Sequence, residues 1–433
     1  MSLSDKNIKY IELSTNDFGG AGHAALKSVE ELRKKGIDAK LIVWNKKSNE
    51  DFVIGIYNSN NYLDRVILFF FHVVSKLLKK MAFGTPNDRK YIYFDIQKGF
   101  VSAKKILKLY GDVPDVITVG WVTDFVTTKT VYDLKEMTGA KVVYFMTDDA
   151  PITGGCHYPW DCKGYTYNCY PCPALKKGCK CAQKTLLFKH RFITSDMVIS
   201  GTTNDANRAK KSLLFRNSVI IRSATLNPNP YHFNRIVIRD KWGIDNSKYV
   251  IFCGASSVND KRKGFSHLVE ALSIFKNKEG DVSRVLILVA GDGKIDFPRG
   301  YEVKSLGKLD FKDLFKAYAC SDLFVCPSVE DSGPMMINYA VMAYIPVVAF
   351  EMGIALDIVL HKENGYIAKW SDSTDFAEGI SYCYHHEYKY NREKLEKINN
   401  YLADEIKKNR TFWNYFYDII IPSVNIKDRR ECQ

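Results

Sequence analysis

Three basic residues directly before an expected helix could bind an anion. Lys261, Arg262 and Lys263 follow the apolar run Tyr249–Cys253, and the helix is expected to begin after Gly264. Arginine can hold a phosphate through two N–H groups, lysine adds a point charge, and the positive end of the helix dipole lies at the same place. The segment predicts a phosphate site, with a solvated basic turn as the alternative.

A pair of acids follows a second apolar run, Leu323–Cys326. Glu330 and Asp331 fall on the loop after this run, and Gly333 with Pro334 opens the next helix. Carboxylates accept hydrogen bonds from sugar hydroxyls, and a helix N-terminus offers free N–H groups to a phosphate. The loop is therefore a candidate sugar site. The alternative is an acid pair that is favoured only by the helix dipole.

A glycine-rich turn is the third candidate. Gly19 and Gly20 follow the strand-like segment Ile8–Leu13 and precede a helix, so the backbone there can approach a ligand closely. Their spacing differs from the dinucleotide-binding G-x-G-x-x-G pattern, and any tight turn between a strand and a helix can contain glycine.

Four cysteines lie close together in the first half of the chain. Cys156, Cys162, Cys169 and Cys172 have the spacing C-x5-C-x6-C-x2-C. Four thiolates can hold one structural zinc ion, which would order a loop with few apolar residues. Reduced thiols packed in a loop are the alternative, and disulfides are disfavoured because the N-terminus does not resemble an export signal. The surrounding basic and aromatic segment suits an anionic acceptor or lipid headgroups. Nucleic acid fits the charge, but no recognised nucleic-acid module accompanies it.

The elements that must position these residues are short apolar strands that alternate with helical stretches. This alternation predicts parallel sheets covered on both faces. The 433 residues exceed the ~250–300 that one core organises, so we expect two doubly wound domains. Asn-Pro steps in 224–234 mark the boundary, because a residue before proline disfavours helix. We expect domains at 1–225 and 226–405, with a cysteine-rich insertion at 153–191. A helical tail at 406–433 would return to the first domain. The expected strands are Ile8–Leu13, Ala39–Trp44, Val116–Trp121, Lys141–Met146, Met197–Ser200, Ser218–Arg222, Tyr249–Cys253, Val285–Ala290, Leu323–Cys326 and Pro346–Phe350.

Charge and hydropathy restrict the partners. The formal net charge of +13 suits nucleotide diphosphates, acidic lipid or nucleic acid without choosing among them. The longest apolar run, Val66–Ser75, is shorter than the ~20 residues that span a bilayer. It lies in an expected helix, Leu63–Met81, which either packs into the core or lies against anionic lipid. We expect a cytoplasmic protein, with peripheral attachment to the inner membrane face as the second option.

Together, these segments resemble a known family. The second half is similar to the retaining, nucleotide-sugar-dependent glycosyltransferases of family 4 (group 1), which have the GT-B fold. The first half resembles a subgroup associated with surface-polysaccharide and lipid-linked sugar assembly, through Gly19-Gly20-Ala21 and the motif TGGCHY with its trailing cysteines. The matching stretches are RKG (262–264), AGDG (290–293), PSVEDSGPMMIN (327–338), PVVAFEMGIALDIV (346–359), NGYIA (364–368) and TGGCHY (153–158).

The resemblance implies a fold and a set of roles. It implies two Rossmann-like domains that face each other across a cleft, with a C-terminal helix packing back on the first. Arg262 and Lys263 correspond to the residues at the donor diphosphate, and the turn at Gly19 and Gly20 corresponds to the loop that approaches the donor. The resemblance implies no metal for the chemistry, so a zinc ion would be structural.

The chain departs from the family at two places, and the first lies among the implied donor-side residues. Asp331, with Glu330 beside it, corresponds to the first acid of the E-x7-E pair, which contacts the transferred sugar. The position of the second acid holds Asn338 or Tyr339, depending on which acid is counted first. The remaining implied donor residues are Gly333 and Met335, at the start of the helix.

The second departure lies after the strand Lys141–Met146. The subgroup has His-Asp at this point, whereas this chain has Thr147-Asp148-Asp149. Asp148 remains as a candidate catalytic acid, without the histidine ring of the family.

The resemblance implies an enzyme that moves a sugar, of hexosyl type, from a nucleotide-diphosphate donor to a saccharide or lipid-linked acceptor in cell-surface polysaccharide assembly. The replaced second acid motivates the rival hypothesis. On that view the chain is a catalytically impaired GT-B protein that binds a glycan, a lipid or an enzyme subunit.

Overall fold

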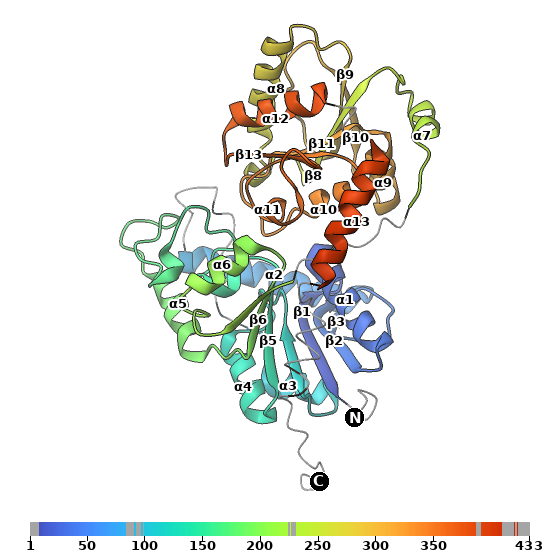
Figure 1. Ribbon diagram of the computed structural model, residues 1–433. Helices are drawn as coiled ribbons and strands as arrows, with labels where there is room; N and C mark the ends of the chain where they lie inside the picture. Colours follow the sequence, from blue (N-terminus) through green and yellow to red (C-terminus); the bar gives the residue numbers. More distant parts are fainter. Residues whose placement is uncertain are drawn as a thin grey trace. The chain divides into compact units, whose positions relative to one another are not determined.

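The computed structural model describes residues 8–83, 91, 97, 99–223, 226, 231–386, 391–408, 420 and 422. The chain forms two compact units, each built around a parallel sheet (Figure 1). The first unit comprises Met1–Ser200, Asp205–Ser223 and Phe412–Gln433. The second comprises Gly201–Asn204 and Ala224–Thr411.

The sheet of the first unit has seven strands in the order β3-β2-β1-β4-β5-β6-β7, all parallel. The chain runs outward from β1 to β3 on one side and from β4 to β7 on the other. Ligands of open parallel sheets bind beyond the carboxyl ends of the strands where the order reverses, here between β1 and β4. The strands are β1 (Lys9–Asn16), β2 (Asp38–Lys46), β3 (Val53–Asn58), β4 (Val116–Val119), β5 (Lys141–Met146), β6 (Met197–Ser200) and β7 (Val219–Arg222).

Helices enclose this sheet because both of its faces are apolar. In β1, Tyr10 packs with Ala25 and Val29 of α1, while Ile11 and Leu13 join a separate core cluster on the opposite face. Alternate side chains of a strand point to opposite faces, so a strand that is apolar throughout needs cover on both sides. The helices are α1 (Gly19–Lys34), α2 (Tyr62–Phe83), α3 (Ala103–Tyr110), α4 (Thr128–Thr138), α5 (Cys181–Phe192) and α6 (Thr203–Lys211).

The second unit repeats the arrangement with six parallel strands in the order β10-β9-β8-β11-β12-β13, which reverses between β8 and β11. Its strands are β8 (Tyr249–Ser257), β9 (Val285–Asp292), β10 (Glu302–Gly307), β11 (Leu323–Cys326), β12 (Val347–Phe350) and β13 (Gly365–Ala368). Its helices are α7 (Arg235–Trp242), α8 (Phe265–Glu279), α9 (Phe311–Cys320), α10 (Met335–Met342), α11 (Ala355–Ile358), α12 (Ser373–His385) and α13 (Arg392–Lys408).

The expected fold class, two doubly wound parallel domains, is confirmed, and each expected strand is present. Three further strands, β3, β10 and β13, were not expected. The division between the units falls after Ser223. Most of the expected linker 224–234 and of the tail 406–433 lies outside the described residues. Within the tail, Ile420 is described and is buried in the core cluster that contains Ile8 and Tyr10 of the first unit.

Candidate functional site

In the second unit, two loops meet where the strand order reverses. The loop after β8 contains Arg262, and the loop after β11 contains Val329 and Glu330. The backbone N–H groups of Val329 and Glu330 both donate to the carbonyl of Arg262, at 2.9 and 3.3 Å. Gly264 has φ +63°, and a Cβ at this position would lie 1.9 Å from the carbonyl oxygen of Pro327. Only glycine therefore permits this approach, which holds the basic loop against the acidic loop.

The charged side chains of these loops pair with each other. Lys263 Nζ forms an ion pair with Asp331 Oδ2, and Asp331 Oδ1 accepts a hydrogen bond from the N–H of Gly333 at 3.1 Å. A guanidinium nitrogen of Arg262 lies 2.6 Å from Asp260 Oδ2. Two cations and two carboxylates thus occupy one edge of the sheet. Such a group can bind an anion if the lysine exchanges its carboxylate for a phosphate oxygen.

The remaining predicted residues of this unit surround the start of α10. Met335 is the first residue of α10 and is exposed, whereas Glu330 and Asn338 are buried. The ring of Tyr339 packs against Phe311 and Phe315, with centroids 5.3 and 5.7 Å away, and partial burial raises the pKa of its hydroxyl. The two alternatives for the second acid therefore differ. Position 338 is enclosed, and position 339 carries a ring that is held by aromatic packing.

Trp370 also lies beside the acidic loop, although the sequence did not single it out. Its indole Nε1 donates to the carbonyl of Val329 at 2.9 Å, and about half of the residue is exposed. It stands two residues after β13, so an aromatic residue after an edge strand was the signal in the sequence.

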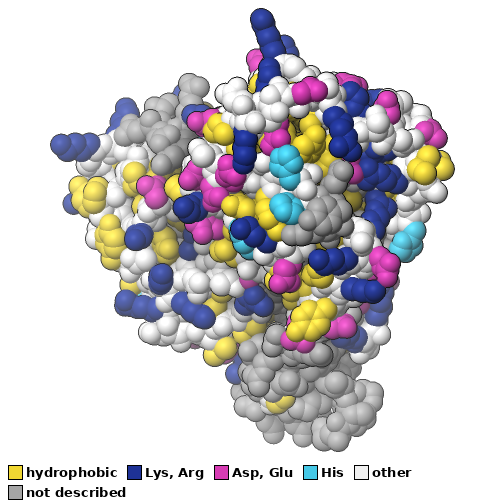
Figure 2. All heavy atoms as spheres, turned by 45° about the horizontal axis from the view of Figure 1, so that its top comes forward, with side chains coloured by type: hydrophobic (Ala, Val, Ile, Leu, Met, Phe, Trp, Pro, Cys, Tyr) yellow, Lys and Arg dark blue, Asp and Glu magenta, His cyan; other side chains and the backbone are white. Residues whose placement is uncertain are grey.

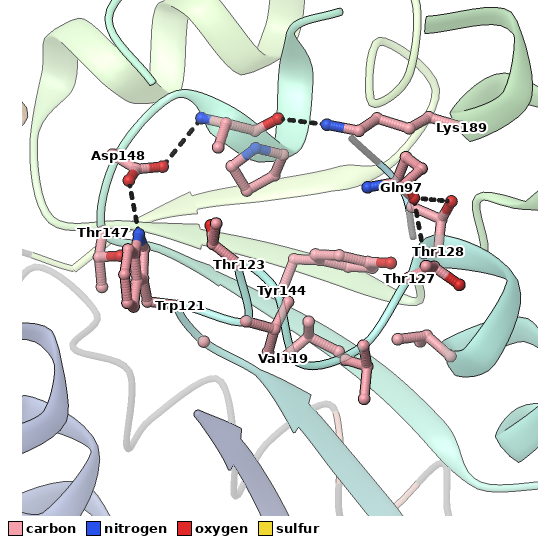
Figure 3. Close-up of a pocket in the computed structure, with 16 residues that line it drawn as sticks. Gln97, Val119, Trp121, Thr123, Thr127, Thr128, Tyr144, Thr147, Asp148 and Lys189 are labelled. Carbon is pink, nitrogen blue, oxygen red and sulfur yellow. Dashed lines mark hydrogen bonds between the residues drawn. The ribbon is translucent and has the colours of Figure 1, made fainter. Parts of the chain in front are cut away.

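In the first unit, Asp148 lies after β5 and receives three polar groups, of which Figure 3 shows that of Trp121. Its Oδ1 accepts from the N–H of Ala150 at 2.8 Å, and its Oδ2 accepts from Trp121 Nε1 at 3.0 Å. His157 Nδ1 lies 2.6 Å from the same Oδ2. A carboxylate has about four acceptor positions, so these contacts fix its orientation and leave little capacity for a substrate.

His157 corrects the expectation that no imidazole stands near Asp148. The family has its histidine directly before the aspartate, but here the ring comes from the TGGCHY segment, nine residues later. The neighbouring Asp149 is fully buried and pairs with Arg208 of α6 at 2.5 Å. Lys189 of α5 is also buried, and its ammonium group donates to the carbonyls of Ala150 and Thr153. The loop after β5 is therefore held by charged groups on several sides.

A pocket of the first unit lies beside this loop, and Figure 3 shows its lining. The space between its lining residues is about 500 Å³ when the part open to solvent is counted, but its interior cavity is only about 40 Å³, below the ~300–1,000 Å³ of most ligand sites. Valine side chains make up much of its lining, and hydroxyl groups, one indole and one carboxylate supply its polar groups. The polar lining residues include Gln97, Trp121, Thr123, Thr127, Thr128, Thr147, Asp148 and Lys189.

The glycine-rich turn opens α1 as expected. Gly19 has φ +74°, a conformation that favours glycine, whereas a Cβ on Gly20 would meet no atom within 4 Å. Space beside Gly20 is therefore open, as the proposed approach to a ligand requires.

The four cysteines carry free thiols. Burial and the neighbouring thiol groups raise the pKa of Cys156, Cys169 and Cys172, and that of Cys169 reaches about 12. Across the described residues, no three His, Cys, Asp or Glu side chains are arranged so that they could hold a metal ion. Zinc binding would require the thiols to move closer together, and the zinc site stays a prediction.

The folds and sites described so far define a chain of two Rossmann-like domains with the GT-B architecture. Residues 247–386, which include the site of the second unit, match the model of the family of glycosyl transferases group 1. No curated protein sequence matches the chain.

Several solved structures share this fold across nearly the whole chain. Sucrose-phosphate synthase from Thermosynechococcus elongatus is 13% identical, with a TM-score of 0.60 over 95% of this chain and 99% of that one. HepE of Anabaena, solved with UDP, is 14% identical, with a TM-score of 0.56 over 96% and 100% of the two chains. A mutant of TarM of S. aureus, solved with fondaparinux, alpha-GlcNAc-glycerol and UDP, is 13% identical, with a TM-score of 0.53 over 93% and 97%. At these identities the likeness establishes the fold.

Proposed function

We propose that the protein transfers a sugar from a nucleotide-diphosphate donor to a saccharide or lipid-linked acceptor. The observation that carries the proposal is the contact between the loop of Arg262 and Lys263 and the acidic loop, where the strand order reverses between β8 and β11. The family match over 247–386 supports it, as do the UDP complexes of HepE and TarM. Transfer with retention, within the assembly of a surface polysaccharide, is the form that the sequence resemblance favours.

In this proposal the donor diphosphate binds in the second unit. Arg262 and Lys263 contact its oxygens, and the N-terminal turn of α10, at Gly333 and Met335, directs N–H groups toward the same charge. The bond between the anomeric carbon and the diphosphate breaks, and its electron pair leaves with the diphosphate. The cations stabilise this charge as it develops. The acceptor hydroxyl bonds to the anomeric carbon, and its proton passes to an oxygen of the departing diphosphate.

The acids have separate proposed roles. Asp331 and Glu330 accept hydrogen bonds from the hydroxyls of the transferred sugar, and binding of the diphosphate draws Lys263 away from Asp331. Asp148 orients Trp121 at the pocket of the first unit, where we propose that the acceptor binds, and His157 contacts the same carboxylate.

Calorimetric titration with UDP and GDP tests the donor site. We expect Arg262→Ala/Lys263→Ala to lower the affinity by ~100-fold or more, because charged hydrogen bonds contribute ~1.5–3 kcal/mol each. Lys294→Ala is the matched control, since Lys294 is an exposed cation of the same unit that pairs with Asp296. Unchanged affinity in the double variant would mean that the phosphate site is elsewhere.

The rival hypothesis of a non-catalytic binding protein needs a different measurement. Incubation with UDP-sugars and an acceptor extract, followed by detection of released UDP, distinguishes the two. Tight nucleotide binding without release by any donor would favour the rival. Release that depends on both Asp331 and an acceptor would support transfer.

A further inference from the structure

Helix α2 (Tyr62–Phe83) packs on the first unit through only one of its faces. Leu68, Phe71 and Leu78 contact the core cluster of the sheet, and Ser75 between them is buried. Phe71 also packs against Trp44 of β2, at a centroid distance of 5.1 Å. These residues recur every three or four positions, so they form a single stripe along the helix.

The opposite side of α2 is apolar and exposed. Phe69 and Phe70 are 69% and 63% exposed, although large aromatic side chains normally contribute most of their stabilisation through burial. Scattered exposed apolar residues need no explanation, but a continuous stripe along a six-turn helix marks an interaction surface. The exposed apolar residues of this helix are Tyr62, Leu63, Val66, Ile67, Phe69, Phe70, Val73, Leu77 and Met81.

Basic residues border this apolar stripe on one side. Arg65, Lys76 and Lys80 are exposed on α2, and Lys79 pairs with Asp124 at 2.8 Å. The helix contains one acid, Asp64, which accepts a hydrogen bond from the backbone N–H of Asn58. The border is therefore positive without opposing charge from the same helix.

Helix α3 carries further exposed lysines in the first unit. Lys105 lies over the ring of Tyr57, and Tyr57 packs in turn against Phe71 of α2. Lys104 and Lys108 are exposed on the same short helix. Figure 2 shows Lys and Arg side chains scattered among acids over the face in view. Along α2, by contrast, basic residues outnumber the single acid, Asp64.

We propose that the exposed face of α2 docks on an anionic lipid bilayer, with the helix lying in the plane of the interface. Among the described helices none combines the length and apolar character needed to span a membrane. The phenylalanines would enter the acyl boundary while the lysines contact anionic headgroups. An anionic bilayer offers both an apolar layer and negative headgroups, which match the apolar stripe and its cationic border. A protein partner in water would need only the apolar stripe or only the cations.

Flotation of the full chain with vesicles tests this surface. We expect binding to phosphatidylcholine vesicles that contain roughly one third phosphatidylglycerol, and at least tenfold weaker partitioning to phosphatidylcholine alone. Phe69→Ser/Phe70→Ser should lower partitioning by ~10-fold or more, because two apolar side chains no longer enter the boundary. Lys76→Glu/Lys80→Glu should lower it by a similar factor and reduce its dependence on salt.

The control is Ile236→Ser/Val237→Ser on α7, whose side chains are 57% and 59% exposed in the second unit. It should bind vesicles as the unaltered protein does. Equal binding to neutral and anionic vesicles, or no loss in the α2 variants, would overturn the proposal. So would dimers in lipid-free solution that Phe69→Ser/Phe70→Ser dissociates, because a second copy would then cover the face. The charge-reversal variant keeps the test decisive if the serine variant folds poorly.

Discussion

The charged groups at the carboxyl ends of the two sheets differ in how deeply they are buried. In the first unit, the side chains of Asp148 and His157 are 8% and 5% exposed, and Asp149 is fully enclosed. In the second unit, Lys263 and Asp331 are 22% and 13% exposed. An ion pair that water reaches can exchange one partner for a ligand, whereas opening a buried pair leaves an unpaired charge in a poor solvent. The second unit is thus suited to exchange with an anion, and the first to fixing a loop.

The largest expected effect concerns a buried acid in the first unit. Glu12 of β1 is enclosed and accepts a hydrogen bond from Tyr10, and burial raises its pKa from 4.5 to about 8. Because the folded state favours the neutral acid, the contribution of Glu12 to the stability of the folded state is complete below pH 4.5 and is lost as the pH rises through 8. Glu12→Gln should therefore unfold with the same free energy as the unaltered protein at pH 4. At pH 9 it should be more stable, by at most ~5 kcal/mol.

Urea unfolding at several pH values measures this difference. Glu393→Gln, which alters an exposed acid of α13, should leave the dependence on pH nearly unchanged. If Glu12→Gln follows the pH profile of the unaltered protein, water reaches this carboxyl. The charged groups of the first unit would then be less buried than the comparison between the two units requires.

The next effect compares one acid from each unit directly. Asp149→Asn removes the fully buried charge of its pair and leaves Arg208, 15% exposed, without this carboxylate, so it should lower the free energy of unfolding by ~3 kcal/mol. Asp331→Asn should cost about 1 kcal/mol, because Lys263 can turn toward water. Asp331→Asn should also bind UDP at least as tightly as the unaltered protein, since Lys263 is released. Equal destabilisation by the two substitutions would remove the distinction between the units.

How far the sequence predicts this fold depends on where a strand lies in its sheet. Interior strands such as β8 and β11 are continuous apolar runs, and each was expected. The unexpected strands β3, β10 and β13 all lie at sheet edges, whereas the edge strand β7 was expected because it contains the apolar run Val219–Ile221. In β10, Val303 is exposed although it is apolar, and no residue of the strand is fully buried. An edge strand is stabilised by backbone pairing with its one neighbour. Its side chains can therefore be polar, and its sequence need not contain a continuous apolar run.

The candidate sites show the same dependence on topology. Lys263 and Asp331 could be brought together from the sequence because each follows a strand at the reversal point of one sheet. His157 could not be assigned to Asp148, because the segment between them is irregular and no periodicity fixes its path. The four cysteines were found by spacing alone. Whether they hold zinc is a prediction that elemental analysis of the purified protein can decide, with about one equivalent expected.

The smallest effect concerns Tyr339, one of the two positions that replace the second acid. Its ring is held between Phe311 and Phe315, so Tyr339→Phe should retain this packing and change stability by less than ~1 kcal/mol. If the hydroxyl bonds the donor ribose in place of the missing carboxylate, the substitution should weaken UDP binding by ~2- to 10-fold, the value of one neutral hydrogen bond.

Deoxy analogues of UDP make this contact specific. When the ribose hydroxyl that bonds Tyr339 is absent, as in 2′-deoxy- or 3′-deoxy-UDP, the unaltered protein and Tyr339→Phe should bind with equal affinity. Tyr401→Phe, on the exposed side of α13, should behave as the unaltered protein with every analogue. A constant ratio between Tyr339→Phe and the unaltered protein for UDP and both analogues would exclude a ribose contact. The buried Asn338 would then be the remaining polar replacement for the acid. Asn338→Ala should weaken the binding of UDP more than the binding of the deoxy analogue that lacks the hydroxyl bonded by Asn338.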